Sequence, residues 1–598
     1  MAESKPSGLI GRLDKLNEFE RQPISPDKFQ SGRHFAGVFA GEHVAATEFV
    51  IGALFVSKGA HTCDVIVGLV FGNLLAVLSW ALICAPIAIK TRLTLYWYLR
   101  KIGGPVVMVV YNILNAVMYC ILAGAMITVS ASALRIPFGI PDQIGWLPTD
   151  IRFVFIVLVV GAVVVTLAIW GFKKLAQFAQ VCSPWMFLMF IAGALAMLPT
   201  IVADMPEIKS LHSFYDFWRL ADAKIWPGPQ PGQTEALGFL HIASFAWICN
   251  LAMHIGLSDM ALLRYAKRAS YGFYSAFGMY LGHYLAWICA GIMGAGAAIL
   301  LKTPLTELDS GSVATTALGI SGAIAVVIAG WTTSNPTIYR AGLALQIATP
   351  NWPRWLVTLL AGAVTTIIAC SPFVFTKLLD FVALYGLLLM PIGAIVFVEH
   401  WIFPRIGLTQ YWISRKGEPV NQPALIAWGV TLAAALVVVL TGVLHQFFLI
   451  IPVWACSAIL YIALSYKFGA REKLPEPAEE EPAVFETAPA EPVSSNIPEP
   501  TAPPTGTSNG AGSEEGAGPA KKSRMYVICG LIAVASLVFC LGISIWVAAS
   551  GEDVYAGRLE LFKKVLLYAT VIYFVFGTIW IFLKEKSERE HICNDMST

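Results

Sequence analysis

Apolar segments long enough to cross a lipid bilayer alternate along most of the chain with short polar or basic loops. Because a spanning helix needs about 20 apolar residues, the pattern predicts about fourteen membrane spans. The predicted spans are 35–57, 64–89, 105–134, 151–171, 179–203, 238–262, 271–301, 313–345, 355–370, 373–398, 424–444, 447–467, 524–549 and 561–583. The expected fold class is therefore an all-α integral membrane protein.

The composition supports this class. Of the 598 residues, 57% are hydrophobic and 13% are charged, and the mean hydropathy is +0.68. So few charged residues cannot cover the surface of a soluble protein of this size, so the lipid bilayer is the expected surrounding. The formal net charge of +2 gives no reason to expect a nucleic-acid partner, and the 11 cysteines are scattered singly, without the spacing of a metal site.

The distribution of basic residues predicts the orientation of the spans, because Lys and Arg favour cytoplasmic loops. Basic residues follow the second, fourth, sixth and tenth spans, as at Lys90, Lys173, Arg264 and Arg405. Both termini are therefore expected in the cytoplasm, in a multi-pass protein of the plasma (inner) membrane, and no cleaved signal peptide is expected. The loop 204–235 separates two halves of five spans, and an odd number of spans inverts one half relative to the other.

The sequence divides into five regions. They are a cytoplasmic N-terminal tail at 1–34, a core of about twelve helices at 35–467, a linker at 468–523, a C-terminal transmembrane hairpin at 524–584 and a cytoplasmic tail at 585–598. The linker is rich in Pro and Glu, as in "PEPAEEEPAVFETAPAEP", and this composition predicts disorder. We interpret the hairpin as an accessory element at the edge of the core, although a regulatory or oligomerisation element has the same pattern.

Ionisable residues interrupt the first span. Glu42, His43 and Glu48 occur within seven residues of one another, and a charged residue at the centre of a membrane helix costs roughly 2.5 to 3.5 kcal/mol on insertion scales. Glycines and alanines around them would allow the helix to break and expose carbonyl groups that coordinate a cation. Alternatively, the two carboxylates pair with His43 or with a buried base and only fix the packing.

Two further spans carry polar clusters. The sixth places Asn250, His254, Ser258 and Asp259 in an apolar helix, with Gly256 as a point where the helix could break. In the eighth, Thr332, Thr333 and Ser334 precede Asn335 and Pro336. Hydroxyl oxygens suit a small hard cation such as sodium when carbonyl groups join them, but these hydroxyls could instead bond the carbonyls of their own helix.

Four sequence pieces resemble the nucleobase:cation symporter family of purine, cytosine and hydantoin permeases. They are "GNLLAVLSW", "KTRLTLYWYLRKIGG", "RYAK" and "WTTSN", in an order and spacing similar to that family over about residues 33 to 467. The resemblance implies a LeuT-like fold with a five-plus-five inverted repeat. It also implies a symporter rather than an enzyme, which couples a small-molecule solute to sodium or protons by alternating access and needs no other cofactor.

The family's binding residues transfer to this chain by position. The resemblance implies a sodium ion held by the carbonyls of Ala40, His43 and Ala329 and by the hydroxyls of Thr332 and Thr333. It implies a solute site near Val44, Ala45, Tyr119, Asn250, Ala252, His254, Ser334 and Asn335, and the intramembrane Glu48 is a further candidate for that site. Glu42 and Glu48 depart from the family's pattern, and as intramembrane carboxylates they would suit a cationic ligand or a coupled proton.

The leading hypothesis is a sodium- or proton-coupled importer of a nucleobase or a related nitrogen heterocycle. A second hypothesis keeps the fold and changes the solute to an amine, an amino acid or another cation that pairs with Glu42 or Glu48. A metalloenzyme built from Glu42, His43, Glu48 and His254 is disfavoured, since His43 and Glu48 are five residues apart and lie off a common helix face. A non-transporting sensor that signals through the C-terminal hairpin is the remaining alternative.

Overall fold

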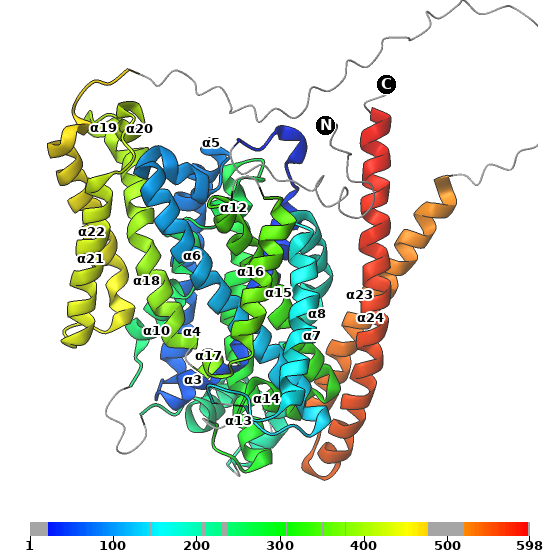
Figure 1. Cartoon of the computed structure of the whole chain (residues 1–598). Helices are drawn as coiled ribbons and strands as arrows, with labels where there is room; N and C mark the ends of the chain where they lie inside the picture. The colour runs from blue at the N-terminus through cyan, green and yellow to red at the C-terminus, as the bar shows by residue number, and fades with distance from the viewer. Residues whose placement is uncertain are drawn as a thin grey trace, which may run out of the picture.

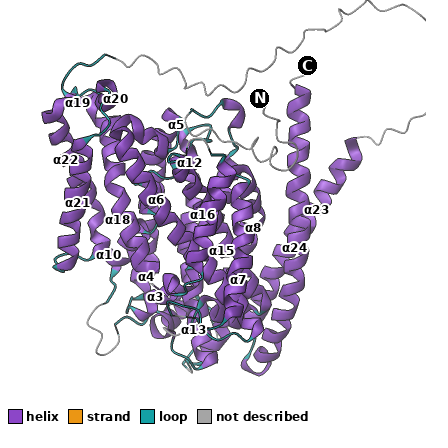
Figure 2. Cartoon of the chain, viewed as in Figure 1, coloured by secondary structure: helices purple, strands orange, loops and turns teal. Residues whose placement is uncertain are grey.

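A computed structural model of the chain describes residues 22–143, 145–205, 207–208, 211–229, 236–305, 308–349, 352–376, 378–475 and 519–595. These residues form helices joined by loops, and Figure 2 shows no strand among them. Ten of the helices described are long and apolar enough to cross a membrane, and two shorter apolar helices, Phe239–Ile248 and Arg354–Ala369, accompany them. The chain is therefore a multi-pass membrane protein.

The helices of the first five spans lie among those of the next five in the bundle (Figure 1). A short helix, η1 (Pro26–Lys28), precedes them. The helices are α2 (Gly32–His43) with α3 (Glu48–Ser57), α4 (Thr62–Ser79) continued by η2 (Trp80–Cys84) and α5 (Ala85–Thr91), α6 (Leu95–Arg135), α7 (Ile151–Ile169) and α8 (Phe172–Ala203). A short connection, α9 (Phe214–Leu220) and η4 (Ala221–Ile225), leads to the second half.

The second half repeats the pattern. Its helices are α10 (Phe239–Ile248), α11 (Leu251–His254) and α12 (Met260–Leu263); η6 (Phe277–Ala286) with α13 (Trp287–Leu301); α14 (Ser310–Leu318) with α15 (Ile320–Gln346); α16 (Arg354–Ala369); and α17 (Phe373–Thr376) with α18 (Leu378–Phe397). Next come η8 (Val398–Ile402), α19 (Phe403–Ile406), α20 (Trp412–Lys416), α21 (Gln422–Leu440), α22 (Ile450–Ser465) and η10 (Tyr466–Ala470). The C-terminal hairpin consists of α23 (Pro519–Ala548) and α24 (Glu552–Asp595).

Helices occur at all fourteen predicted spans, but several predicted boundaries were wrong. The backbone of α6 is not helical at Gly104, which has a φ of 74° before Pro105, so α6 consists of a segment at 95–103 and one at 105–135, and the second matches the predicted third span. The eighth begins at Ile320, because Gly319, with a φ of 63°, separates α14 from α15. Glycine adopts this left-handed conformation without steric cost, so both positions can turn the chain without strain.

The boundaries of the predicted linker also change. The helix before it runs to Ala470, and α23 begins at Pro519, so residues 519–523 belong to the hairpin. The predicted C-terminal tail is helical as far as Asp595. Residues 476–518, which make up most of the predicted linker, lie outside the described residues.

Helix packing follows the pseudo-twofold symmetry of an inverted repeat. In the first half α6 packs against α7, and the equivalent pair in the second half, α15 and α16, is also in contact. By the same symmetry, the contact between α4 and α10 corresponds to the contact between α13 and α3. The contact between α2 and α8 corresponds to the contact between α11 and α18. The central pair, α6 and α15, is its own symmetry mate. The two halves are therefore interleaved rather than placed side by side.

The first and sixth spans are interrupted at mid-length. In the first, α2 ends at His43, Val44 leaves helical geometry with a ψ of 64°, and α3 restarts at Glu48. In the sixth, Asn250 separates α10 from α11, and residues 255–259, including Leu257 with a φ of 64°, separate α11 from α12. An interrupted membrane helix leaves backbone groups free to bind a ligand, so these breaks define where a site can form.

The C-terminal hairpin is hydrogen-bonded to the core along α8. The Trp185 indole donates to the Thr570 hydroxyl at 3.1 Å, and the Tyr573 hydroxyl donates to the Val181 carbonyl at 2.7 Å. Further along, the Tyr555 hydroxyl donates to the Ala196 carbonyl at 2.8 Å. At the other end of α24, Glu585 lies 3.9 Å from His34 of α2. Figure 1 shows η1 and the end of α24 at the same end of the bundle.

Candidate functional site

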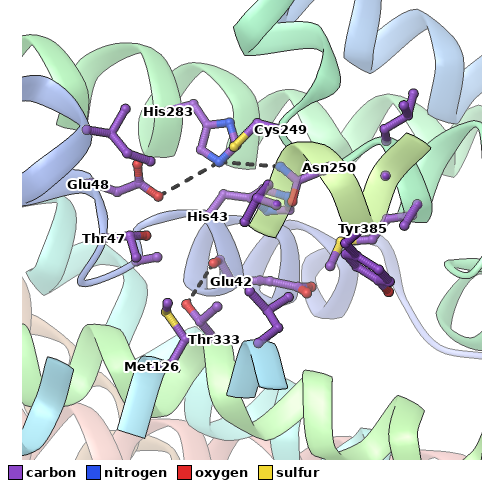
Figure 3. A pocket seen from close by; sticks show the side chains of 18 residues that line it. Glu42, His43, Thr47, Glu48, Met126, Cys249, Asn250, His283, Thr333 and Tyr385 are labelled. Atoms are coloured by element: carbon purple, nitrogen blue, oxygen red, sulfur yellow. Dashed lines mark hydrogen bonds and ion pairs between the residues drawn. The ribbon is translucent and has the colours of Figure 1, made fainter. Parts of the chain in front are cut away.

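A cavity lies where the two interrupted helices meet, enclosed by α6, η6, α15 and α18 (Figure 3). Its polar lining comes from Glu42, His43, Thr47, Glu48, Cys249, Asn250, His283 and Thr333. Its apolar and aromatic lining comes from Ile51, Leu122, Met126, Leu251, Met253, Val382 and Tyr385, with Ala45, Ala252 and Gly386 completing the wall. A mostly apolar cavity with a few polar groups has the usual character of a small-molecule site.

The Glu42 carboxylate is paired with a buried guanidinium. Arg340 of α15, which is 0% exposed, donates to both Glu42 oxygens at 2.5 and 3.0 Å and to Asp259 Oδ1 at 2.5 Å. The Trp80 indole donates to the second Asp259 oxygen at 2.6 Å. Of the alternatives weighed for Glu42, the geometry matches pairing with a buried base, and this pairing joins α2, the break before α12, and α15.

Sequence reasoning missed Arg340, although a signal was present. The residue lies inside the predicted eighth span, and an intramembrane Arg requires a partner. Its carboxylates come from spans one and six, so only the folded arrangement identifies them. Removing one partner from such a buried network costs about 3 to 5 kcal/mol, because the remaining charges lose their compensation.

Glu48 stands in a different environment from Glu42. It is 2% exposed and lies at the start of α3, facing the cavity (Figure 3). Its Oε1 lies 3.8 Å from His283 Nε2, and its Oε2 has no hydrogen-bond partner among the residues that the structure describes. The Asn250 amide lies 3.4 Å from the same His283 nitrogen. Glu48, His283 and Asn250 thus connect three helices on one side of the cavity.

Three imidazoles surround this side of the site. The His43 ring lines the cavity, with Nδ1 hydrogen-bonded to the Phe39 carbonyl at 2.7 Å. His283, which was not predicted, stacks on Trp287 with ring centroids 4.5 Å apart. His254 lies behind the wall, where its Nε2 bonds the Trp247 carbonyl at 3.0 Å and its ring packs on Trp80. His254 is therefore positioned as a packing residue.

Thr333 connects α15 to the broken end of α2. Its hydroxyl lies 2.9 Å from the Glu42 carbonyl and 3.1 Å from the Ala329 carbonyl (Figure 3). The neighbouring Thr332 hydroxyl bonds the Ile328 and Ala329 carbonyls of its own helix and faces Met186. Of the two predicted sodium-binding hydroxyls, Thr333 is thus the one that reaches the first span.

The three carbonyl groups predicted to bind sodium, those of Ala40, His43 and Ala329, face different neighbours. The Ala40 carbonyl accepts the Val44 amide at the end of α2. The His43 carbonyl faces η6, since a Cβ on Gly282 would lie within 2.3 Å of it. Ala329 accepts hydrogen bonds from both threonines. The first-span carbonyl beside Thr333 is that of Glu42, one residue from the predicted His43.

The residues predicted to bind the solute fall into two groups. Ala45, Glu48, Asn250 and Ala252 line the cavity. The others do not line it: they are Val44, Tyr119, His254, Ser334 and Asn335. Val44 lies in the hydrophobic core, and the Tyr119 ring packs on that of Tyr385. The Ser334 hydroxyl donates to the Gly330 carbonyl at 2.6 Å. Asn335 instead lines a separate small cavity with Thr332 and Phe178.

The alternative of a metalloenzyme has no supporting cluster in the part of the chain that the structure describes. There, no group of three or more His, Cys, Asp or Glu side chains has an arrangement that could hold a metal ion. The Glu42 carboxylate, which that hypothesis required as a ligand, is held by Arg340.

No protein-family model and no curated protein matches the sequence. Solved structures do match. Mhp1, a nucleobase-cation-symport-1 family transporter, in a closed conformation with bromovinylhydantoin bound, has a TM-score of 0.59 and 16% identity, covering 78% of this chain and 98% of that chain. The inward-facing conformation of Mhp1 has a TM-score of 0.54 and 16% identity, covering 75% and 92%.

A third structure, a substrate-bound, outward-open Na⁺-coupled sialic acid symporter, has a TM-score of 0.53 and 15% identity, covering 78% of this chain and 97% of that chain. All three likenesses extend over nearly the whole of the known transporters. Together with the symmetric helix contacts, they confirm the predicted all-α fold with a five-plus-five inverted repeat.

Proposed function

We propose that the protein is a secondary active transporter that couples a small nitrogen-containing heterocycle to sodium or protons by alternating access. The observation that carries this proposal is the cavity at the meeting point of the two broken helices, beside which the Thr333 hydroxyl of α15 donates to the Glu42 carbonyl of α2. Transporters with inverted repeats hold solute and ion at such a point and rock one bundle against the other around it.

The cavity lining supports a small organic solute. Tyr385, Met126 and Val382 supply aromatic and apolar surface, and Asn250 with Glu48 supplies hydrogen-bonding groups. A planar heterocycle with several nitrogen atoms matches this combination. One of the similar structures has a hydantoin bound, and another belongs to a sialic acid symporter, so this fold holds polar organic solutes in other proteins.

A coupling ion is proposed beside Thr333. A hydroxyl oxygen and the carbonyl oxygens of Glu42 and Ala329 converge there, and such neutral hard donors suit sodium. We further propose that both termini face the cytoplasm and that the protein resides in the plasma (inner) membrane, because basic residues concentrate in the loops at that end.

The test is uptake into proteoliposomes under an imposed sodium gradient, with purified full-length protein and a panel of radiolabelled heterocycles. The Thr333→Ala variant should lose the sodium dependence of uptake. A matched control is Thr366→Ala, which removes a buried hydroxyl that bonds only its own helix, at Gly362, and should leave sodium dependence unchanged. Thr332→Ala should have a weaker effect than Thr333→Ala, because its hydroxyl does not reach α2.

Two results would contradict the proposal. The first is that the purified protein binds a solute of the panel but does not accumulate it against its concentration gradient. The second is equal sodium dependence in Thr333→Ala and in the unaltered protein, which would remove the proposed ion site while leaving transport itself possible.

A further inference from the structure

We infer that the transported solute is an organic cation and that its positively charged nitrogen pairs with Glu48. This inference rests on the proposed transport function and specifies the substrate class of the same cavity. It depends on which of the buried charges at the site already have partners.

The charges around the cavity do not balance. Three buried carboxylates, those of Glu42, Glu48 and Asp259, lie at or beside it. The only guanidinium paired with them in the described residues is that of Arg340, which binds Glu42 and Asp259. With neutral imidazoles, two negative charges remain. A cation beside Thr333 would compensate one of them near Glu42, and Glu48 would still lack a partner.

Among the described residues, no basic side chain lies within direct hydrogen-bonding distance of Glu48. Its ion-pair neighbour is His283, at 3.8 Å from Oε1, which exceeds the usual length of a charge-assisted hydrogen bond. Its Oε2 is buried at the cavity and has no hydrogen-bond partner in the described part of the chain. An unpaired buried carboxylate is costly, so the group needs either a proton or a cation from outside the protein. A cationic solute in the cavity supplies that charge directly.

The remaining lining suits a cation with an aromatic or otherwise apolar body. Tyr385 contributes an aromatic ring to the wall and Met126 a polarisable thioether (Figure 3). Met253 contributes a second thioether. Aromatic rings attract cations by about 0.5 to 2 kcal/mol, and methionine adapts to irregular shapes. Asn250 can hydrogen-bond a polar substituent on the solute. The chemical class is therefore a protonated or quaternary nitrogen heterocycle, or a related aromatic amine.

The first test compares matched cationic and neutral solutes. Thermal stabilisation of the purified full-length protein is measured with N1-methylnicotinamide against nicotinamide, and with benzylamine against benzyl alcohol. The cationic member of each pair should give the larger shift, by several degrees at millimolar concentration. Glu48→Gln should abolish this preference, and Glu48→Asp should retain part of it. Equal shifts for both members of each pair in the unaltered protein would overturn the inference.

A matched control tests whether the effect requires the carboxylate at the cavity or follows from neutralising any buried carboxylate. Glu399 is also fully buried, but the Tyr461 hydroxyl at 2.5 Å and the Tyr411 amide at 2.6 Å satisfy it, and it does not line the cavity. Glu399→Gln should therefore preserve the preference for cations. If it abolishes the preference as fully as Glu48→Gln does, Glu48 is not the recognition group.

A second test needs no knowledge of the natural solute. Cys249 lines the same cavity, so its rate of modification reports the local potential. We compare a cationic methanethiosulfonate, the ethyltrimethylammonium reagent, with the neutral methyl reagent, and subtract the rates of Cys249→Ala. The ratio of cationic to neutral rates should fall at least threefold in Glu48→Gln. An unchanged ratio would mean that Glu48 carries no negative charge there.

The two proposals fail in distinguishable ways. If neutral heterocycles are transported and Cys249 modification is indifferent to Glu48, the substrate class is wrong while the transport function stands. If cations bind with the expected dependence on Glu48 but are never moved across the membrane, the inferred pocket stands and the transport function is wrong.

Discussion

At the scale of single residues, the two carboxylates of the first span have opposite situations. Glu42 and Glu48 look alike in the sequence, since both are acidic side chains in one apolar segment. In the fold, Glu42 is held by a bidentate guanidinium, whereas Glu48 has one oxygen without a partner. The first residue therefore stabilises the arrangement of helices around the cavity, and the second remains available to a ligand.

This difference predicts the effect of removing Arg340. Arg340→Gln should lower the free energy of unfolding by about 3 to 5 kcal/mol, because Glu42 and Asp259 would be left buried without a counter-charge. The loss is measured by the midpoint of thermal unfolding in detergent. Arg340→Lys should recover only part of it, because an ammonium group cannot donate to both Glu42 oxygens in a planar fork.

A double variant checks the mechanism of that loss. Glu42→Gln combined with Arg340→Gln should be more stable than Arg340→Gln alone, since the uncompensated carboxylate is removed as well. Strict additivity of the two single effects would show that the pair contributes no interaction energy.

At the scale of elements, small residues decide how closely the first span approaches its neighbouring helices. Gly37 and Gly41, predicted to let the helix break, instead allow α2 to lie against α8, where added Cβ atoms would meet Gln180, Ala179 and Ser183. The break itself lies after them, at Val44. There the His43 carbonyl packs on Gly282 of η6, in a gap that no side chain could occupy.

This contact predicts that Gly282→Ala weakens the site without breaking the fold. The added methyl group would approach the His43 carbonyl to 2.3 Å, so η6 must move away from the broken end of α2. We expect at least a tenfold loss of solute affinity, measured as the solute concentration that half-saturates thermal stabilisation. Gly429→Ala is the matched control, because no atom lies within 4 Å of its added methyl group. Similar affinities in both variants would show that the η6 contact does not shape the site.

At the scale of the whole molecule, the C-terminal hairpin is an integral part of the packing. It follows α8 through the Trp185–Thr570, Val181–Tyr573 and Ala196–Tyr555 hydrogen bonds. The cavity, in contrast, is lined entirely by residues that precede the hairpin. The hairpin is therefore expected to contribute to stability and not to the recognition of the solute.

Truncation after residue 475 tests this expectation. The shortened protein should unfold at a lower temperature than the full chain, because the face of α8 that the hairpin covers becomes exposed. It should retain solute-dependent stabilisation and uptake. Loss of uptake in truncated protein that still binds solute would instead favour the hypothesis of a sensor that signals through the hairpin.

A single substitution gives a milder version of the same test. Thr570→Val removes the acceptor of the buried Trp185 indole at nearly constant volume. An unsatisfied buried donor costs about 1 to 3 kcal/mol, so the midpoint of thermal unfolding should fall while solute affinity stays unchanged. A fall in affinity of the same size as in Gly282→Ala would show that the hairpin acts on the site.

The class, the positions of the fourteen predicted spans and the inverted repeat could all be predicted from the sequence. These properties follow from the length of apolar runs and from the odd number of spans in each half, both of which are local features of the chain. The same local features located the polar clusters, so Glu48, Asn250 and Thr333 could be singled out before the fold was known.

Which of those polar groups act together depends on how the helices pack in the folded protein. Arg340 is nearly 300 residues from Glu42 and 81 from Asp259, and no periodicity along one helix relates groups on three different helices. The position of His283 beside Glu48 and the orientation of the Thr332 hydroxyl away from α2 also depend on contacts between different helices. Hydrophobic burial sets each helix locally, but the pairing of buried charges depends on which helices meet, and that is settled when the two repeats pack together.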